Sequence, residues 1–183
     1  MQSNPFKFSH LGFFATDLVK MEAFYTGLLG LTVTDRGELP GENGPVSLVF
    51  MSKDPDEHHQ VVLISGRPAD MSYNPINQIS FKGSDLQSLR DMHNKLIEME
   101  ADDIQPVTHG NALSIYARDP EGNRLELYID MPWYVTQPMR VPADLTLNDE
   151  DLMAALEEHA RALPGFRPRS EWRAEIAAKM GVA

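Results

Sequence analysis

The chain contains no cysteine among its 183 residues. This absence excludes disulfide bonds, zinc–thiolate and iron–sulfur sites, and any catalysis by a thiol. A bound metal would therefore need ligands from histidine, carboxylate, amide or water. Basic residues are also scarce, because 16 stand against 27 acidic ones and leave a formal net charge of −11. Nucleic acids and anionic membranes are bound through basic patches, so neither is an expected partner.

Long hydrophobic runs are missing as well. No apolar stretch is long enough to span a bilayer, and the N-terminus lacks the basic and apolar segments of a secretion signal. The composition is otherwise typical of a globular protein, with 42% hydrophobic and 23% charged residues. We therefore expect a soluble, cytoplasmic protein of one domain, or of two small halves that share a core.

The first part of the chain predicts a strand, a helix and three further strands. Residues 6–15 alternate and are rich in phenylalanine, and Thr16-Asp17 supplies a helix N-cap. Apolar residues at helical spacing follow, and Gly30 can end the helix with a positive φ. The three following strands are expected over residues 31–38, 46–51 and 58–64.

The second part of the chain predicts the same order. Ser84-Asp85 supplies the N-cap of a second helix, whose apolar face carries Leu89, Met92 and Leu96. The flanking strands are expected over residues 76–81, 104–108, 113–117 and 125–129.

The two parts can be aligned residue by residue. The segment His10–Leu18 lines up without a gap with the segment Gln78–Leu86. Duplication of one module explains this match, although two unrelated strand–helix units could share the same cap chemistry. We predict an α+β fold in which two tandem βαβββ modules, at about residues 5–65 and 73–130, form a curved mixed sheet around one pocket.

Residues 131–183 follow neither module. A proline-bounded arm around Trp133 leads to a helix capped by Asn148, and a final short helix begins near Ser170. Neither helix is apolar enough to form a core of its own. We expect this C-terminal arm and its helices to pack on the domain of residues 1–130 or on a dimer partner, with Trp133 and Trp172 as anchors.

Polar residues occupy the positions that could line the pocket. If the modules form one curved sheet, the inward positions carry His10 and one of residues 58–60 in the first module, and Gln78 and Glu126 in the second. Imidazole, carboxylate and amide oxygen are suitable ligands for a divalent first-row metal. These residues are therefore candidate metal ligands.

Each candidate also has a plainer interpretation. Glu126 could be a solvent-exposed carboxylate or a partner of Arg124, since most carboxylates are exposed. His10 could be a core histidine, and Gln78 a buried amide that bonds only to backbone. The adjacent pair His58-His59 is expected to point to opposite faces of a strand, so at most one member faces the pocket.

The most specific motif is Asp-Pro-Glu-Gly-Asn-Arg-Leu-Glu at residues 119–126. Together with the paired modules, it resembles the closing signature of the vicinal oxygen chelate superfamily, over about residues 5–130. That superfamily includes glyoxalase I, fosfomycin-resistance proteins, bleomycin-binding proteins and extradiol ring-cleaving dioxygenases. The resemblance implies a metal ligand on the first strand of each module and a glutamate at the end of the second. These positions are His10, Gln78 and Glu126.

Within that superfamily the chain resembles the type I extradiol dioxygenases most. Their paired-histidine strand is similar to the run from His58 to Leu63, which implies that His59 is an acid/base residue beside the iron. The resemblance also implies that Tyr116 binds a substrate oxygen, and it aligns His109 with a further catalytic histidine. Without the resemblance, Tyr116 could be an ordinary aromatic residue of a strand, and His109 a loop histidine without a role. His93 and His159 are expected to be structural only.

One position departs from that pattern, because such dioxygenases have a histidine where this chain has Gln78. Glutamine is a ligand in some glyoxalase I enzymes, so a divalent metal is still implied, with Fe(II) first and Mn, Ni or Zn as alternatives. The sequence predicts a metal-dependent extradiol-type dioxygenase that acts on a small aromatic diol and O₂. A homodimer is expected from the family. The alternatives are a glyoxalase-like lyase or isomerase, and a metal-free binding protein of the bleomycin-resistance type.

Overall fold

The computed structural model describes residues 7–68, 70–71 and 73–182, and the chain divides into two compact units. The N-terminal unit comprises Pro5–Asn77 together with Arg118–Asn123. The C-terminal unit comprises Gln78–Ala117 and Arg124–Ala183. Residue 6, the expected start of the first strand, lies outside the described residues. No helix within the described ranges is long and apolar enough to cross a membrane.

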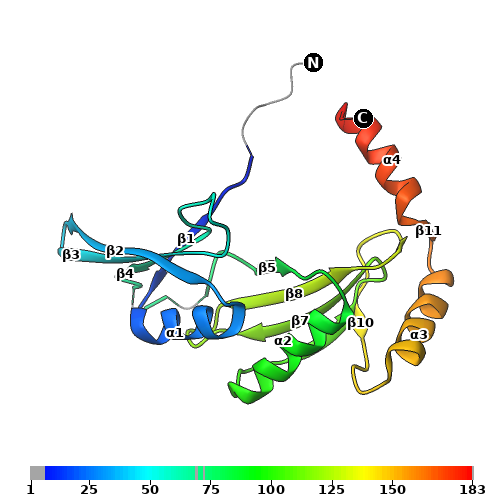
Figure 1. The fold of residues 1–183 in the computed structure, drawn as a ribbon, viewed down its shortest axis with the longest axis horizontal. Coiled ribbons are helices and arrows are strands. Elements are labelled where there is room, and N and C mark those ends of the chain that lie inside the picture. The colour runs from blue at the N-terminus through cyan, green and yellow to red at the C-terminus, as the bar shows by residue number, and fades with distance from the viewer. Residues whose placement is uncertain (1–6, 69, 72, 183) are drawn as a thin grey trace. The chain divides into compact units, whose positions relative to one another are not determined.

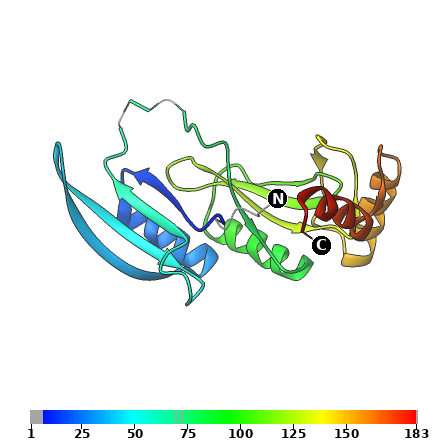
Figure 2. The same ribbon diagram turned by 90° about the horizontal axis from the view of Figure 1, so that it is seen from above.

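The N-terminal unit is a four-stranded sheet with one helix along one face (Figure 1). Its strand order is β1-β4-β3-β2, with β1 parallel to β4 and the other pairs antiparallel. The strands β2 and β3 form a long hairpin whose tip extends beyond β4 (Figure 2). In chain order the elements are β1 (Leu11–Ala15), α1 (Leu18–Leu29), β2 (Thr32–Gly41), β3 (Gly44–Ser52) and β4 (Val61–Ser65).

The helix α1 begins and ends where the sequence predicts. The Asp17 carboxylate caps it by accepting a hydrogen bond from the backbone N–H of Lys20 at 2.9 Å. Gly30 ends it with a φ of 67°, a left-handed conformation that glycine adopts without strain. Its buried side chains form one face that packs on the sheet and supply much of the core of this unit: Met21, Phe24, Tyr25 and Leu28.

The C-terminal unit repeats this topology. Its five-stranded sheet has the order β10-β6-β7-β8-β5, where β10 is Val141–Pro142. The strand β5 runs parallel to β8, as β1 does to β4. The predicted α+β fold of two βαβββ modules is therefore confirmed. In chain order the elements of the second module are β5 (Ile79–Lys82), α2 (Leu86–Glu98), β6 (Gln105–Thr108), β7 (Ala112–Arg118) and β8 (Arg124–Asp130).

Two details of the sheets differ from the expectation. The described strands form a separate sheet in each unit instead of one mixed sheet, because β1 and β5 each pair with the last strand of their own module. The strands expected over 58–64 and 76–81 begin at Val61 and Ile79. Before β4, the Gln60 side chain accepts a hydrogen bond from the backbone N–H of Lys53 at 3.0 Å, which holds that segment as a loop.

The C-terminal arm and helices pack on their own unit. Arg90 of α2 donates to the backbone carbonyls of Leu145 and Leu147 and pairs with Asp149 at 2.9 Å, so it ties the start of α3 to α2. The strand β10 pairs with β6, and β9 pairs with β11. The tail elements are β9 (Trp133–Tyr134), β10 (Val141–Pro142), α3 (Asp149–Arg161), β11 (Arg167–Pro168) and α4 (Arg169–Met180).

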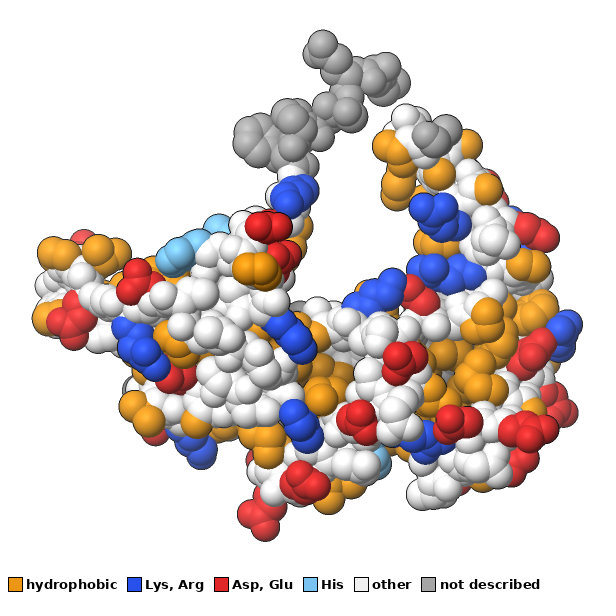
Figure 3. All heavy atoms as spheres, in the orientation of Figure 1, with side chains coloured by type: hydrophobic (Ala, Val, Ile, Leu, Met, Phe, Trp, Pro, Cys, Tyr) orange, Lys and Arg blue, Asp and Glu red, His pale blue; other side chains and the backbone are white. Residues whose placement is uncertain are grey.

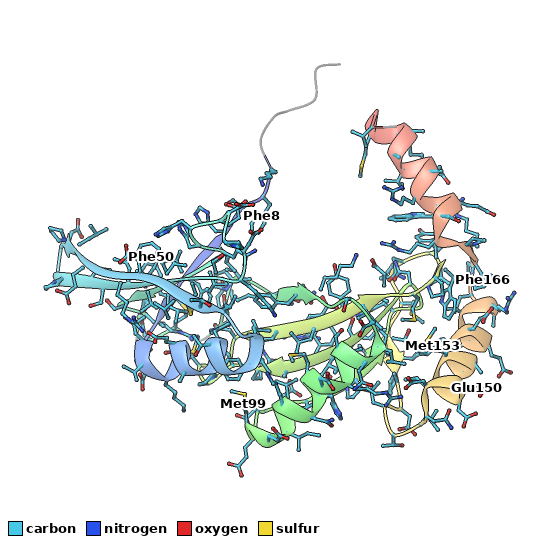
Figure 4. The ribbon with its side chains drawn as sticks, in the orientation of Figure 1. Phe8, Phe50, Met99, Glu150, Met153 and Phe166 are labelled. Carbon is cyan, nitrogen blue, oxygen red and sulfur yellow. The ribbon has the colours of Figure 1, made fainter. Side chains whose placement is uncertain are left out.

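Both tryptophans anchor this tail. Trp133 is buried, and its indole N–H donates to the carbonyl of Gly110 at 2.6 Å. Its ring also contacts Phe166, which lies between α3 and α4 (Figure 4). Trp172 of α4 stacks on Tyr134, with the ring centroids 5.2 Å apart.

The motif over residues 119–126 divides at Asn123. Its turn belongs to the N-terminal unit, whereas Arg124 and the residues after it belong to the C-terminal unit. Asp119 is buried in the turn, and its carboxylate accepts hydrogen bonds from the Tyr25 hydroxyl at 3.0 Å and the Asn123 amide at 2.6 Å. It also accepts from the backbone N–H groups of Glu121 and Asn123. Burial, and next the charge of Asp119, raise the pKa of Tyr25 well above its ordinary value, so this hydroxyl stays a donor.

The next carboxylate of the turn, Glu121, accepts hydrogen bonds from the backbone just before α1. One of its oxygens accepts from the backbone N–H groups of Thr16 and Asp17 at 2.7 and 2.8 Å. The other pairs with Arg67 at 3.0 Å. The turn is thus a structural part of the N-terminal unit that supplies acceptors to buried donors and to the entry of the helix.

Candidate functional site

One face of the C-terminal sheet is polar. Side chains alternate along a strand, so Leu125 and Leu127 face the side of α2 while Glu126 faces the other. Ser80 lies opposite Glu126 in the β5–β8 register. This polar face carries Gln78, Ser80, Ser114, Tyr116, Arg124 and Glu126.

Glu126 is the centre of this face. Its Oε2 accepts hydrogen bonds from Gln78 Nε2 at 2.7 Å and from the Ser80 hydroxyl at 2.6 Å. Its Oε1 accepts from the hydroxyls of Ser114 and Tyr116, each at 2.9 Å. A carboxylate offers about four acceptor positions. All of them are therefore filled by neutral donors of this unit.

Two of the plainer interpretations are wrong for this face. Glu126 is buried, and it does not pair with Arg124, whose guanidinium instead lies over the Tyr116 ring with Cζ 4.0 Å from the centroid. The side chain of Gln78 bonds to no backbone group of the described residues; its amide nitrogen donates to the side chains of Ser80 and Glu126. Sequence alone could not decide these points, because they depend on which strands are neighbours.

Tyr116 connects Glu126 to His109. The hydroxyl of Tyr116 lies 2.9 Å from Glu126 Oε1 and 3.0 Å from His109 Nε2. His109 Nδ1 lies 2.7 Å from the carbonyl oxygen of Met139. A carbonyl only accepts, so Nδ1 carries a proton, and Nε2 of a neutral His109 is an acceptor directed at the Tyr116 hydroxyl. The structure therefore places the sequence-predicted residues Glu126, Tyr116 and His109 in one chain of hydrogen bonds.

The Tyr116 hydroxyl stays protonated in this chain. Burial, and then the hydrogen bond to Glu126 and its charge, raise the pKa of Tyr116 to about 12. One hydroxyl proton thus stands between two acceptors, Glu126 and a neutral His109. When His109 is also protonated at Nε2, it donates to Tyr116 while Tyr116 donates to Glu126, so the chain can accept one further proton.

Three contributors to this face were missed by sequence reasoning. Ser80 and Ser114 each lie two residues from a predicted site residue, Gln78 and Tyr116 respectively, so strand alternation could have found them. The third is the carbonyl of Met139, which belongs to the arm before β10. No sequence signal marks it, because the arm reaches His109 only through the tertiary fold.

The arm depends on Gly110. This residue has a φ of 72°, and a Cβ added there would overlap the side chain of buried Val135. We expect Gly110→Ala to lower the free energy of unfolding by about 2–4 kcal/mol, since it adds backbone strain to overpacking. Urea denaturation, monitored by tryptophan fluorescence, measures this loss of stability. The Trp133 indole reports on the region because its N–H donates to the Gly110 carbonyl. Gly122→Ala, at a φ of 79° with open space around it, should cost only the backbone strain; equal losses in both variants would contradict the packing argument.

The predicted residues of the first module form a second cluster, on the N-terminal unit. His10 and His59 are in ring contact with centroids 4.2 Å apart, and the Nδ1 atoms of His58 and His59 lie 2.9 Å apart. Figure 3 shows histidine side chains at the surface of this unit in pale blue. Partial burial, followed by the neighbouring His10 and His58, lowers the pKa of His59 below its ordinary value.

The expectation that His58 and His59 point to opposite faces is wrong. Both rings pack against Phe50, at centroid distances of 5.6 and 5.3 Å. Phe50 lies on the face of its sheet away from α1 (Figure 4). Both histidines precede β4 and belong to a loop, where the alternation of a strand does not apply.

The donor types on the polar face fit a divalent metal, with one change. Carboxylate and amide oxygens are metal ligands, but the acceptor positions of Glu126 are filled and Gln78 presents its nitrogen. Turning over the Gln78 amide would free one position on Glu126 Oε2 and present the amide oxygen on the same side. Within either unit, the described residues include no group of three His, Asp or Glu side chains that could hold a metal ion. Gln78 is thus the residue of this unit whose amide oxygen could join Glu126 at a metal.

The comparisons with known proteins agree with this topology. The family model of the Glyoxalase/Bleomycin resistance protein/Dioxygenase superfamily matches residues 7–127. Biphenyl-2,3-diol 1,2-dioxygenase 2 of Rhodococcus globerulus is 28% identical over 134 residues, which cover 71% of this chain and 65% of the relative. The match thus spans less than two thirds of the length of that relative.

Solved structures show the same fold at low identity. A glyoxylase/bleomycin resistance protein/dioxygenase domain from Frankia sp. EAN1pec matches with a TM-score of 0.59 and 18% identity, over 70% of this chain and all of that one. The fosfomycin resistance protein FosX of Listeria monocytogenes, solved with Mn(II) and sulfate, matches with a TM-score of 0.50 and 14% identity, over 67% of this chain and 91% of that one. At these identities the likeness shows the fold alone.

Proposed function

Because the chain belongs to the glyoxalase/bleomycin resistance protein/dioxygenase superfamily, we propose that it is an extradiol-type dioxygenase that opens the ring of a small aromatic diol with O₂. The observation that carries the proposal is the hydrogen-bonded chain of Glu126, Tyr116 and His109 on the polar face. The likeness to a biphenyl-diol dioxygenase supports the substrate class.

Gln78 and Glu126 are the proposed metal ligands of this face. His10, the third ligand implied by the resemblance, and His59, the implied acid/base residue, belong to the N-terminal unit and stay predictions. A bound divalent metal, Fe(II) in this proposal, would hold two vicinal substrate oxygens and lower the pKa of a diol hydroxyl. The homodimer and the cytoplasmic location also stay predictions.

The side chains of the polar face have separate tasks in this proposal. Neutral Tyr116 turns its hydroxyl proton from Glu126 to a substrate oxygen, or passes a proton along the chain to His109. His109 accepts that proton at Nε2, because its Nδ1 proton is held by the Met139 carbonyl. Ser80 and Ser114 hold the Glu126 carboxylate in place while these protons move.

A metal-free binding protein is the second candidate. It is favoured by the four neutral donors on Glu126, which leave the carboxylate satisfied without a cation. In this case the polar face binds the ligand through hydrogen bonds alone, and no ring is opened.

One assay separates the two candidates. The full chain is loaded anaerobically with Fe(II), mixed with air-saturated solutions of several catechols, and followed by O₂ uptake and by the absorbance of the ring-opened product. We expect one O₂ consumed per diol, and no uptake after treatment with a chelator. If the loaded protein consumes no O₂ but the chelated protein binds a catechol in calorimetry, the dioxygenase proposal is wrong and the binding protein is supported.

A further inference from the structure

Two arginines flank the ring of Tyr116. Arg124 of β8 lies with Cζ 4.0 Å from the ring centroid, and Arg140 of the arm with Cζ 5.4 Å from it. Arg140 is held there by a hydrogen bond of 2.6 Å to the side chain of Gln105, the residue opposite Tyr116 in the β6–β7 register. Sequence elements far apart thus bring two positive charges to one aromatic ring.

Neither guanidinium has a carboxylate partner among the residues that the structure describes. This contrasts with the rest of an acidic chain of net charge −11, where carboxylates are abundant. Six other arginines each pair with an Asp or Glu: Arg36, Arg67, Arg90, Arg161, Arg167 and Arg169. Glu126 is beside Arg124 on the same face but is occupied by its four neutral donors.

The position of Arg124 over the ring leaves its donors available. The cation is attracted to the face of the aromatic ring, and this contact uses none of the five N–H groups of the guanidinium. No hydrogen bond occupies these groups on Arg124 within the described part of the chain. A planar fork of this kind is suited to bidentate binding of a carboxylate.

The spacing along β8 places Arg124 about one ring width from Glu126 of the proposed diol site. Arg124 and Glu126 are two residues apart on one strand, so their Cα atoms are about 7 Å apart at a rise of about 3.3 Å per residue. That separation is close to the width of a substituted benzene ring. A diol beside Glu126 and Tyr116 would therefore bring a ring carboxylate to Arg124.

We propose that Arg124, assisted by Arg140, binds a carboxylate on the ligand, so that the substrate class is an aromatic diol that carries an acidic group. This inference rests on the proposed function for its diol part. The anion site itself rests on the two unpaired guanidinium groups over Tyr116. It distinguishes this chain from the relative named for the uncharged biphenyl-2,3-diol.

Calorimetric binding of three probes to the full chain tests the inference. The probes are 3,4-dihydroxybenzoate, which has both groups, catechol, which lacks the acid, and benzoate, which lacks the diol. We expect wild-type protein to bind dihydroxybenzoate at least about tenfold more tightly than catechol, as charge-assisted bidentate hydrogen bonds provide. Arg124→Gln should remove this preference, so that dihydroxybenzoate and catechol bind to the variant with equal affinity. Arg140→Gln should reduce the preference in part.

Two further variants keep the test decisive. Arg124→Lys retains the charge and the stem, so it should fold as wild type does and keep only part of the preference, because an ammonium group cannot form the planar fork. Arg173→Gln, on exposed α4, removes an exposed arginine that has no ion pair with any described residue, and it should change nothing. Thermal unfolding of every variant confirms that the fold is intact.

The outcomes separate the inference from the proposed function. Equal binding of catechol and dihydroxybenzoate, or an Arg173→Gln effect as large as that of Arg124→Gln, overturns the inference even if a catechol is cleaved. Arg124-dependent binding of benzoate and dihydroxybenzoate, with no ring opening in the O₂ assay, supports the anion site and overturns the dioxygenase proposal.

Discussion

Replacing Asp119 by alanine is expected to lower the free energy of unfolding by about 3–5 kcal/mol. The carboxylate is buried and accepts four hydrogen bonds, two of them from the side chains of Tyr25 and Asn123. Alanine would leave these buried donors unsatisfied, and each such group costs about 1–3 kcal/mol. The loss is therefore greater than the loss of any one contact.

Urea denaturation followed by circular dichroism measures this loss. Tyr25→Phe is the matched control, because it removes one donor and leaves the other three satisfied; it should cost about 1 kcal/mol. Trp133 and Trp172 both belong to the C-terminal unit, so tryptophan fluorescence shows whether that unit unfolds together with the rest. An Asp119→Ala protein as stable as Tyr25→Phe would show that the turn does not contribute as described.

Replacing Glu126 by glutamine is expected to lower the rate of O₂-dependent diol consumption by at least about a hundredfold. Mutation of a residue that only hydrogen-bonds to a metal ligand already lowers metal affinity or activity by about 10- to 100-fold, and loss of the ligand itself should cost at least as much. The change removes the negative charge that would hold a cation. An amide also offers only one acceptor oxygen, and its NH₂ group would face hydroxyl or amide donors of Gln78, Ser80, Ser114 or Tyr116. Steady-state O₂ uptake and titration with Mn(II) followed by its magnetic resonance signal measure the two effects.

Two companion variants locate the loss. Tyr116→Phe keeps the carboxylate and removes one donor, so metal binding should persist while the rate falls by about a hundredfold, the usual contribution of a positioned proton donor. Glu157→Gln on α3 removes an exposed carboxylate that pairs with Arg161, and it should leave both measurements unchanged. Full activity of the Glu126→Gln variant would show that Glu126 has no part in the mechanism.

The sequence predicted those parts of the fold that depend on local chemistry. The caps at Asp17, Asp85 and Asn148 lie where Ser, Asp and Asn patterns placed them, because a cap needs only its own first turn. The sequence also named Gln78 and Glu126 as candidate site residues, and the structure joins them by a hydrogen bond of 2.7 Å.

Long-range packing decided what the sequence could not. His58 and His59 share a side because their segment is a loop held by Gln60, which no alternation pattern reveals. The contact of His109 with the Met139 carbonyl, and the placement of Arg140 over Tyr116, both depend on the path of the C-terminal arm. The resemblance suggested His109 as a site residue, but only the structure identifies the proton that its Nδ1 carries.

The division of the 119–126 motif sets a limit on how the protein can be taken apart. A fragment that ends at Asn77 contains the whole first module, yet it lacks the carboxylates of Asp119 and Glu121 that its Tyr25 hydroxyl and the entry of α1 require. The boundary of the repeat is therefore not the boundary of the compact unit. A fragment cut at Asn77 is expected to leave the Tyr25 hydroxyl and the backbone N–H groups of Thr16 and Asp17 without the acceptors that the turn supplies.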